Sequence, residues 1–147
     1  MNYYDFEIRP RYEETDQMGV VYHGNYYRYF EVGRCEYLRS LGYSYRGLEE
    51  AGIILPVVES SCRYRVPILY DQEVIIRTFI ETFKGVKIAF LYQLLDKETG
   101  QLLAEGQTLH AFVDKAMRPL RVSRLDKAFV KAIEDAMEGK ESQSIQE

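Results

Sequence analysis

The stretch Thr15-Asp16-Gln17-Met18-Gly19-Val20-Val21-Tyr22-His23-Gly24-Asn25-Tyr26 decides how this chain is expected to fold. Its first half is polar and punctuated by glycine, which predicts a loop that ends in a short apolar step. From about Asn25 the spacing of the apolar and aromatic residues becomes helical. The residues that recur on one face are Tyr26, Phe30, Gly33 and Tyr37. This pattern predicts one long helix of about 17 residues, with Gly42 as its C-cap.

A glycine at position 33 is unusual, because glycine costs a helix interior about 1 kcal/mol relative to alanine. Close packing against a sheet is the usual reason to accept that cost, so we expect a sheet to touch the helix at Gly33. A second, short helix is predicted over 44–50, with Ser44 as its N-cap and a stop near Gly52.

The rest of the chain predicts five strands. Aromatic and β-branched residues interleaved with charges indicate a first strand over 3–11. The expected strands after Gly52 cover 53–64, 73–83, 86–95 and 102–114. Short loops join the last three, so these strands form an antiparallel meander.

A final helix is expected from the N-cap Ser123 to about Met137. Its apolar stripe is Leu125, Phe129, Ile133 and Met137. Residues 1–138 are therefore expected to form a single domain, and residues 139–147 a polar, frayed C-terminal tail.

These elements indicate an α+β fold in which a long antiparallel sheet wraps around a central long helix. The strands carry apolar residues on both faces, which is more than one helix can cover. Part of the second face is therefore expected to be buried in an oligomer, most simply a symmetric dimer.

Composition and charge narrow the classes of partner. The net charge of −4 gives no general reason to expect nucleic-acid binding. No stretch approaches the roughly 20 apolar residues that span a membrane, and residues 1–5 lack the pattern of a signal peptide. Cys35 and Cys62 lack metal-ligand spacing and are interpreted as buried free thiols in a reducing compartment. We therefore expect a cytoplasmic protein with no metal site and no membrane span.

The chemistry is expected where the loop meets the helix. Asp16 places a carboxylate shortly before a helix start, where backbone N–H groups lack intrahelical partners and favour an anion. Gly24 allows a ligand to approach closely. A carboxylate beside an oxyanion site suits acyl transfer, with a base or nucleophile on one side and a charge stabiliser on the other. The alternative is a turn-forming Asp16, with His23 as a capping or core residue and His110 as a structural histidine.

The 15–26 stretch, with Tyr29-Phe30-Glu31 and Arg34-Cys35-Glu36-Tyr37-Leu38-Arg39 after it, resembles a known family. It is similar to the hotdog-fold acyl-CoA thioesterases of the 4-hydroxybenzoyl-CoA thioesterase family, and most to their Tol–Pal-associated bacterial branch. The similarity extends to about Met137. It implies a helix wrapped in an antiparallel sheet, homodimers that often pair into homotetramers, and hydrolysis of an acyl thioester without a metal or other cofactor.

The resemblance also implies roles for individual residues. Asp16 matches the catalytic carboxylate, and the backbone N–H of His23 falls on the oxyanion donor, while Gly19 and Tyr22 match positions that form the pocket. The residues that hold the phosphates of coenzyme A vary in such families. The candidates here are Lys84, Lys87, Arg63 and Arg65, although an ordinary solvated charge is the more common role for any one such residue.

Other functions stay open at this point. One is a module that binds acyl-CoA or an acyl carrier without hydrolysis. Another is a hotdog dehydratase or hydratase with His110 or His23 as its base. The sequence does not define the acyl group, the choice between coenzyme A and acyl carrier protein, or whether Asp16 activates water or attacks directly.

Overall fold

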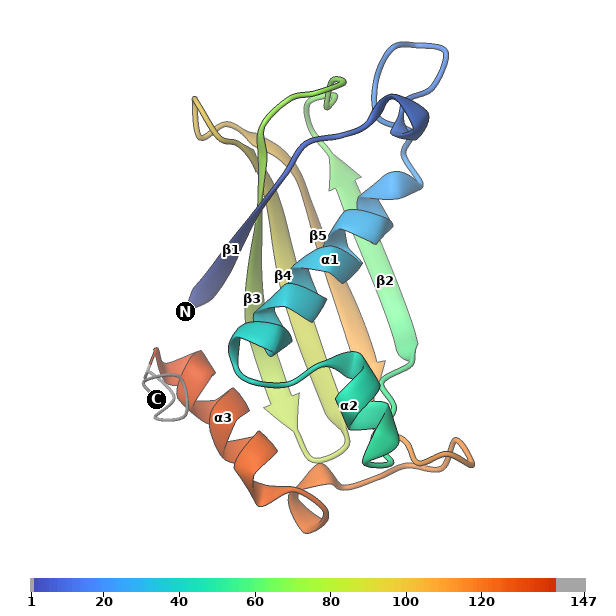
Figure 1. Cartoon of the computed structure of the whole chain (residues 1–147), viewed down its shortest axis with the longest axis vertical. Helices are drawn as coiled ribbons and strands as arrows, with labels where there is room; N and C mark the ends of the chain where they lie inside the picture. The colour runs from blue at the N-terminus through green and yellow to red at the C-terminus, as the bar shows by residue number, and fades with distance from the viewer. Residues whose placement is uncertain (1, 140–147) are drawn as a thin grey trace.

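The computed structural model describes residues 2–139, and residues 140–147 of the expected tail lie outside the described residues. Its strands are β1 (Tyr3–Ile8), β2 (Val57–Tyr64), β3 (Val74–Lys84), β4 (Lys87–Asp96) and β5 (Leu102–Ala111). They form one antiparallel sheet in the order β1-β3-β4-β5-β2. The helix α1 (Asn25–Ser40) lies along one face of this sheet (Figure 1), which confirms the expected α+β fold.

Shorter elements surround this centre. They are α2 (Tyr45–Glu50), α3 (Lys127–Glu138) and the 3-10 turns η1 (Tyr12–Glu14) and η2 (Val122–Arg124). The Ser44 side chain accepts a hydrogen bond from the N–H of Gly47, so the predicted cap of the short helix is confirmed. α3 packs at the end of β3, at the opposite end of the sheet from the loop that precedes α1 (Figure 1).

The face of the sheet that meets α1 is apolar, as the strand alternation predicts. The buried residues of β3 and β4 that share this face are Val74, Ile76, Thr78, Ile80, Ile88, Phe90, Tyr92 and Leu94. The β3-β4-β5 meander is confirmed, because consecutive strands pair through short turns. The positions of the two outer strands depend on pairings between segments that are far apart in the sequence, because β1 pairs with β3 and β2 pairs with β5.

The closest approach of helix and sheet is at Gly33, as predicted. A Cβ atom on Gly33 would lie 2.4 Å from Thr78 Oγ1 and 2.6 Å from Ile76 Cγ2. Both neighbours are short, buried, β-branched side chains of β3. The glycine is therefore required for packing, and its helix-propensity cost is offset by close contact with the sheet.

Three predicted strands were too long. The strand expected over 53–64 begins only at Val57, since Ile54 forms just an isolated bridge with Val113. The first strand ends at Ile8, because Pro10 has no N–H to donate and the Arg9 side chain turns to Asp71 O at 3.1 Å. The last strand ends at Ala111, since Val113 leaves the ladder and exchanges hydrogen bonds of 2.9 and 3.0 Å with Ile54.

The predicted start of the last helix was also wrong. Ser123 lies in η2, and α3 begins at Lys127 with Asp126 as N-cap, whose carboxylate accepts from the N–H of Phe129 at 3.0 Å. Leu125 is 52% exposed and does not belong to the buried stripe. The apolar face of α3 begins only at Phe129.

A chain of polar groups crosses the core beside β5. Tyr92 Oη lies 2.6 Å from Thr108 Oγ1, and that oxygen lies 2.8 Å from His110 Nε2. His110 Nδ1 lies 3.2 Å from Leu55 O. Burial lowers the pKa of His110 to about 4, so its ring is neutral near pH 7. His110 is a structural histidine, as one of the readings of the sequence had it.

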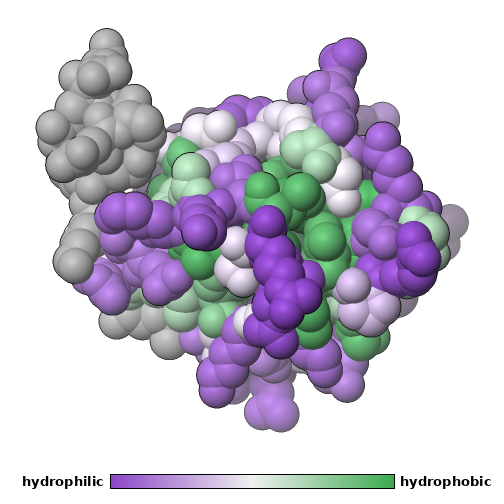
Figure 2. All heavy atoms as spheres, turned by 90° about the horizontal axis from the view of Figure 1, so that it is seen from below, coloured by the Kyte–Doolittle hydropathy of each residue, from purple (hydrophilic) through white to green (hydrophobic). Residues whose placement is uncertain are grey.

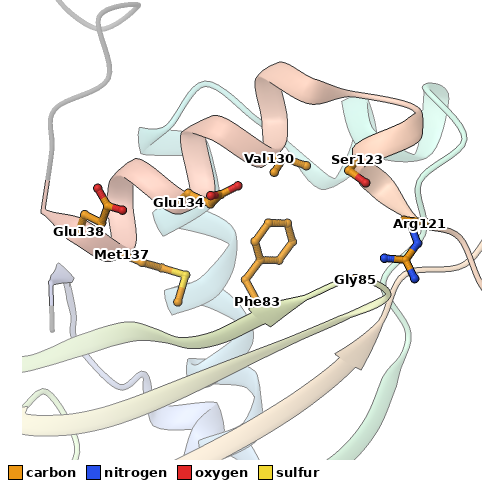
Figure 3. Close-up of a pocket in the computed structure, with 8 residues that line it drawn as sticks. All are labelled: Phe83, Gly85, Arg121, Ser123, Val130, Glu134, Met137 and Glu138. Atoms are coloured by element: carbon orange, nitrogen blue, oxygen red, sulfur yellow. The ribbon is translucent and has the colours of Figure 1, made fainter.

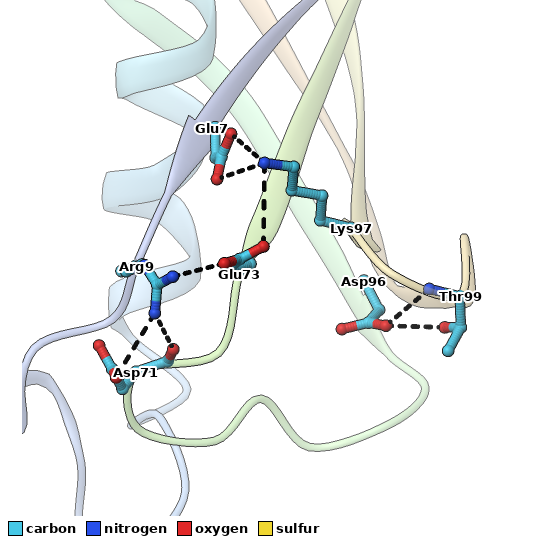
Figure 4. A network of polar contacts seen from close by, with 7 residues as sticks. All are labelled: Glu7, Arg9, Asp71, Glu73, Asp96, Lys97 and Thr99. Carbon is cyan, nitrogen blue, oxygen red and sulfur yellow. Dashed lines mark hydrogen bonds and ion pairs between the residues drawn. The ribbon is translucent and has the colours of Figure 1, made fainter.

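Ion pairs join β1, β3 and the β4–β5 turn on the surface (Figure 4). Lys97 Nζ lies 3.0 Å from Glu7 and 3.8 Å from Glu73, and Arg9 bonds both Glu73 and Asp71. Exposed pairs of this kind stabilise weakly when single. Here they connect the end of β1 to the segment before β3, and that segment touches the loop before α1.

No helix within residues 2–139 is long and apolar enough to cross a membrane. The outer face of the sheet, which points away from α1, carries both apolar and charged residues. Its half-buried apolar residues include Ile75, Phe79, Leu91 and Leu109. The predicted burial of this face in an oligomer stays a prediction.

Candidate functional site

The segment before α1 folds into a tight hairpin. Thr15 and Val21 form an isolated β-bridge, and the N–H of Tyr22 donates to Glu14 O at 2.9 Å. The N–H of Val21 donates to Ile68 O at 2.8 Å, which fixes the hairpin to the segment before β3. These hydrogen bonds therefore fix residues 14–22 and the start of α1 relative to one another.

Asp16 lies at the turn of this hairpin. The N–H of Gly19 donates to Asp16 O at 3.0 Å, and Gly19 has the positive φ of +78° that glycine adopts most readily. Asp16 Oδ1 accepts from the N–H of Met18 at 2.9 Å. Within residues 2–139, Asp16 Oδ2 has no hydrogen-bond partner. Asp16 thus shapes the turn with one carboxylate oxygen, and its other carboxylate oxygen has no partner among the described residues.

The start of α1 leaves backbone donors unused. The carbonyls of Tyr22 and His23 accept from Asn25 and Tyr26 at 2.9 and 3.3 Å, as in a first helical turn. The N–H groups of His23 and Gly24 find no acceptor in the part of the chain that the structure describes. Free N–H groups at a helix start favour an anion.

Aromatic rings cover this helix start. The Tyr22 and His23 rings lie 4.3 Å apart, and both residues are exposed. A Cβ on Gly24 would lie 2.8 Å from Tyr22 Cε2, so the glycine makes room for the Tyr22 ring. The predicted residues Asp16, Gly19, Tyr22 and His23 therefore lie on one hairpin and its helix junction.

Glu14 holds the hairpin and was missed by the sequence reasoning. Its carboxylate accepts from the Tyr29 hydroxyl at 2.7 Å, and its carbonyl accepts from the Asn25 side chain at 2.8 Å. Tyr29 is buried on α1, and burial followed by the Glu14 hydrogen bond raises the pKa of its hydroxyl. Glu14 looked like one more loop charge, since its partner lies 15 positions further along the chain.

β2 contributes a second set of missed residues. The Tyr64 hydroxyl donates to His23 O at 3.0 Å, and its ring meets the Tyr26 ring edge-on at 4.7 Å. Desolvation raises the pKa of Tyr64 to about 12. Burial also raises the pKa of Tyr26, with smaller contributions from Cys62 and from the charge of Asp16. No local pattern signals Tyr64, because it joins the site from 41 positions away.

The candidate phosphate-binding residues lie elsewhere in the chain. Lys84 and Lys87 face each other across the β3–β4 turn, at the far end of the sheet (Figure 1). The length of β3 separates them from the hairpin by about 30 Å. Arg65 pairs with Glu105 at 2.9 Å, and Arg63 lines a hollow of about 690 Å³ on the outer face. Within one chain the two lysines are therefore remote from Asp16, whereas Arg63 and Arg65 flank Tyr64, whose hydroxyl contacts His23 O.

Both cysteines are free, as predicted, but they are half-buried rather than buried. Desolvation raises the pKa of Cys35 and of Cys62, which keeps both as thiols near pH 7. Within residues 2–139, no group of three or more His, Cys, Asp or Glu residues is placed to hold a metal ion.

A separate cavity of about 420 Å³ lies between α3 and the β3–β4 turn (Figure 3). Phe83, Val130 and Met137 give it an apolar lining, and Arg121 and Glu134 add charges. Figure 2, which views the molecule from below, shows apolar surface framed by hydrophilic side chains. The cavity shares no residue with the hairpin, so we assign it no part in the chemistry of Asp16.

Comparison with known proteins places this arrangement in a family. Residues 10–133 match the family model of the thioesterase-like superfamily, a range that includes the hairpin, α1 and the whole of β2 to β5. The chain belongs to the thioesterase-like superfamily. Two curated members are the putative acyl-CoA thioesterase YneP of Bacillus subtilis and the acyl-CoA thioester hydrolase YbgC of Escherichia coli O157:H7. YneP is 37% identical over 116 residues, 78% of this chain and 83% of that protein. YbgC is 32% identical over 107 residues, which are 73% of this chain and 79% of that protein.

A solved member has the same fold. The DHNA-CoA thioesterase of Staphylococcus aureus superposes with a TM-score of 0.85 and 35% sequence identity. The alignment covers 97% of this chain and 98% of that one. The predicted hotdog fold is confirmed by this thioesterase-like member, in which an antiparallel sheet and a long helix are arranged alike.

Proposed function

We propose that this protein is an acyl-CoA thioesterase, which hydrolyses an acyl thioester to a free acid and coenzyme A. The observation that carries the proposal is the hairpin of residues 14–22. It holds Asp16 with one carboxylate oxygen unbonded, and it leads directly into a helix start with two unused N–H groups. Family membership and the names of the relatives YneP and YbgC support the same reaction class.

The proposed chemistry divides between Asp16 and the backbone. The thioester carbonyl points at the helix start, where the His23 N–H stabilises the negative charge that develops on its oxygen. Asp16 either takes a proton from an attacking water or attacks the carbonyl itself to give a mixed anhydride, which water then cleaves. The C–S bond breaks, and the departing thiolate of coenzyme A needs no strong acid.

Replacing the carboxylate by its amide tests the proposal. Asp16→Asn keeps the acceptor for the Met18 N–H but removes the charge that either route requires. We expect acyl-CoA binding to persist and kcat to fall by about 10³-fold or more in a thiol-release assay with acetyl-, octanoyl-, palmitoyl- and benzoyl-CoA. Full turnover by this variant would overturn both routes.

Isotope labelling can identify the anhydride route. In a single turnover in ¹⁸O-water, a mixed anhydride that water cleaves at the Asp16 carbonyl transfers the label to the Asp16 carboxylate. Water activation, like cleavage of the anhydride at the acyl carbonyl, leaves the label in the product acid alone. Label in the peptide that contains Asp16, measured by mass spectrometry, therefore identifies the anhydride route.

The hydrogen bond from the Met18 N–H to Asp16 Oδ1 favours a second candidate, an acyl-CoA-binding or acyl-carrier-binding module in which Asp16 only shapes the turn. Tight binding of the acyl-CoA panel without thiol release would favour that module. For a dehydratase or hydratase, the candidate bases were His110 and His23. His110 is a poor candidate, because it is fully buried and hydrogen-bonded at both ring nitrogens.

A homodimer is part of the proposal, with a dimer of dimers as the larger assembly. β2 forms an edge of the sheet, runs past His23 and exposes Val57 and Val58. Pairing of two β2 edges would place a second subunit beside the site, and only another subunit would bring Lys84 and Lys87 near Asp16. Sedimentation equilibrium of the purified protein tests the assembly.

The finer assignments are also proposals. They are the 4-hydroxybenzoyl-CoA thioesterase family with its Tol–Pal-associated branch, the roles of Gly19 and Tyr22 as pocket formers, the four phosphate-binding candidates, and a cytoplasmic location. The motif at 15–26 supports the branch, and the Tyr22 ring over Gly24 supports a pocket wall. Hydrolysis of acyl carrier protein thioesters in the same assay would test the choice of carrier.

A further inference from the structure

Tyr64 hydrogen-bonds the peptide group that joins the helix start to the residue before it. Its hydroxyl donates to His23 O at 3.0 Å, and that carbonyl also accepts the longer, 3.3 Å bond from the Tyr26 N–H. Tyr64 comes from β2, the edge strand that lies beside the helix start, and its ring is fixed edge-on against Tyr26. The contact therefore anchors the first turn of α1 to the sheet.

This hydrogen bond also sets the direction of a donor. No peptide bond within residues 2–139 is cis, and a planar trans peptide points its C=O and N–H in opposite directions. Holding His23 O towards Tyr64 thus aims the Gly24 N–H away from the helix. The N–H groups of Gly24 and His23 both lack acceptors in the described chain.

We propose that Tyr64 is a positioning residue that orients the His23–Gly24 peptide, so that the Gly24 N–H joins the His23 N–H as a second donor to the thioester oxygen. This inference rests on the proposed thioesterase function and deepens it. An oxyanion site depends on donors that are aligned before charge develops. Tyr64 supplies that alignment from outside the hairpin and without contact with the reacting atoms.

The substitution Tyr64→Phe keeps the ring against Tyr26 and removes only the hydroxyl. The substrate is the acyl-CoA of the four-member panel that the parent protein hydrolyses fastest. We expect kcat to fall about five- to tenfold, because the loss of one hydrogen bond that orients the peptide costs about that factor in transition-state stabilisation. KM and the Kd for coenzyme A should stay within about twofold, because they report ground-state binding.

Tyr3→Phe is the matched control. Tyr3 is 46% exposed, the same as Tyr64, and lies on β1 with its ring against Phe79. We expect this variant to keep the kcat of the parent protein. Both variants are compared per folded molecule, as measured by circular dichroism, so a partial loss of fold does not count as a loss of turnover.

Three outcomes would overturn the inference: an unchanged kcat in Tyr64→Phe, a raised KM at unchanged kcat, or an equal fall in Tyr3→Phe. The Asp16→Asn variant distinguishes these from failure of the function itself. If Asp16→Asn loses turnover while Tyr64→Phe keeps it, the thioesterase proposal stands and only the role of Tyr64 is wrong. If Asp16→Asn keeps full turnover, the proposed function fails first.

Discussion

The start and the middle of α1 are held by different forces. At the start, exposed aromatic rings, hydrogen bonds that Glu14 accepts and the one that Tyr64 donates fix the backbone, and two N–H groups stay unused. In the middle, Gly33 sits against β3 with no room for one more carbon atom. Along one helix, polar contacts hold the start with free backbone donors, and close packing holds the middle.

This difference teaches that activity and stability are separable in this protein. Substitutions in the middle of α1 should change the free energy of unfolding and leave turnover per folded molecule intact. Substitutions at the start should lower turnover per folded molecule and cost less stability. Each prediction below breaks or sharpens this contrast.

The largest stability effect is expected from Gly33→Ala. The new methyl group would overlap Thr78 and Ile76, which are buried and short, so the helix must shift away from the sheet. We expect a loss of about 1–3 kcal/mol in the free energy of unfolding, even though alanine favours helix by about 1 kcal/mol. Urea denaturation measures this loss.

Gly47→Ala on α2 is the matched control for that substitution. A Cβ there would lie 3.1 Å from Ser44 Oγ and meets nothing else within 4 Å, so we expect a much smaller change. Equal stability losses in the two variants would contradict the packing account of Gly33. A fall in kcat per folded molecule in Gly33→Ala would break the contrast between the two regions.

Acidification tests the buried polar chain at His110. The pKa of His110 is about 4 in the folded protein, against 6.5 for an ordinary histidine, because burial disfavours the charged ring. Between these values the unfolded chain binds a proton that the folded chain does not. The contribution of the neutral His110 ring to the free energy of unfolding is fully present above about pH 6.5. It is lost as the pH falls towards 4, at up to about 1.4 kcal/mol per pH unit.

Urea denaturation at pH 7.5 and at pH 5.5 measures that loss. His110→Gln removes the titrating ring, so its free energy of unfolding should depend less on pH over this range, from a lower starting value. An identical pH dependence in parent and variant would show that His110 does not carry the effect.

A smaller effect is expected where Tyr29 joins the helix to the hairpin. Tyr29→Phe removes the hydrogen bond to Glu14 and leaves that carboxylate without its buried donor. We expect a loss of about 1 kcal/mol in stability and a fall of a few-fold in kcat, because the hairpin that carries Asp16 loosens. Urea denaturation and the thiol-release assay report the two effects.

Tyr37→Phe on the same helix provides the comparison. The Tyr37 hydroxyl is buried without a hydrogen-bond partner among residues 2–139, so removing it costs no bond. We expect no loss of stability and an unchanged kcat. If Tyr29→Phe behaved like Tyr37→Phe, the hairpin would not depend on the hydrogen bond between Tyr29 and the Glu14 carboxylate.

Much of the fold was predictable because its evidence is local. The helical spacing from Asn25, the Ser44 cap and the short loops of the β3-β4-β5 meander each follow from neighbouring residues, and Gly33 predicted its own contact with the sheet. Helix α3 was misplaced at its start, since Ser123 and Asp126 are both good caps and only the packing of Phe129 decides between them.

The site was predictable only in part, for the same reason. Asp16, Gly19, Tyr22 and His23 lie within one short motif, and the structure places them on one hairpin. Glu14 and Tyr64 act through partners that are 15 and 41 positions away, and single-sequence patterns do not encode such pairs. The strand order β1-β3-β4-β5-β2 was not predictable from the sequence either, because its outer strands pair with segments far away in the chain.

The central claim is that Asp16 acts through its side chain and His23 through its backbone. Turnover of Asp16→Asn and His23→Ala, measured side by side on the same acyl-CoA, tests this claim most directly. His23→Ala keeps the backbone N–H at the helix start, so we predict a loss of less than about tenfold in kcat, against about 10³-fold or more for Asp16→Asn. Equal losses in the two variants would contradict the account.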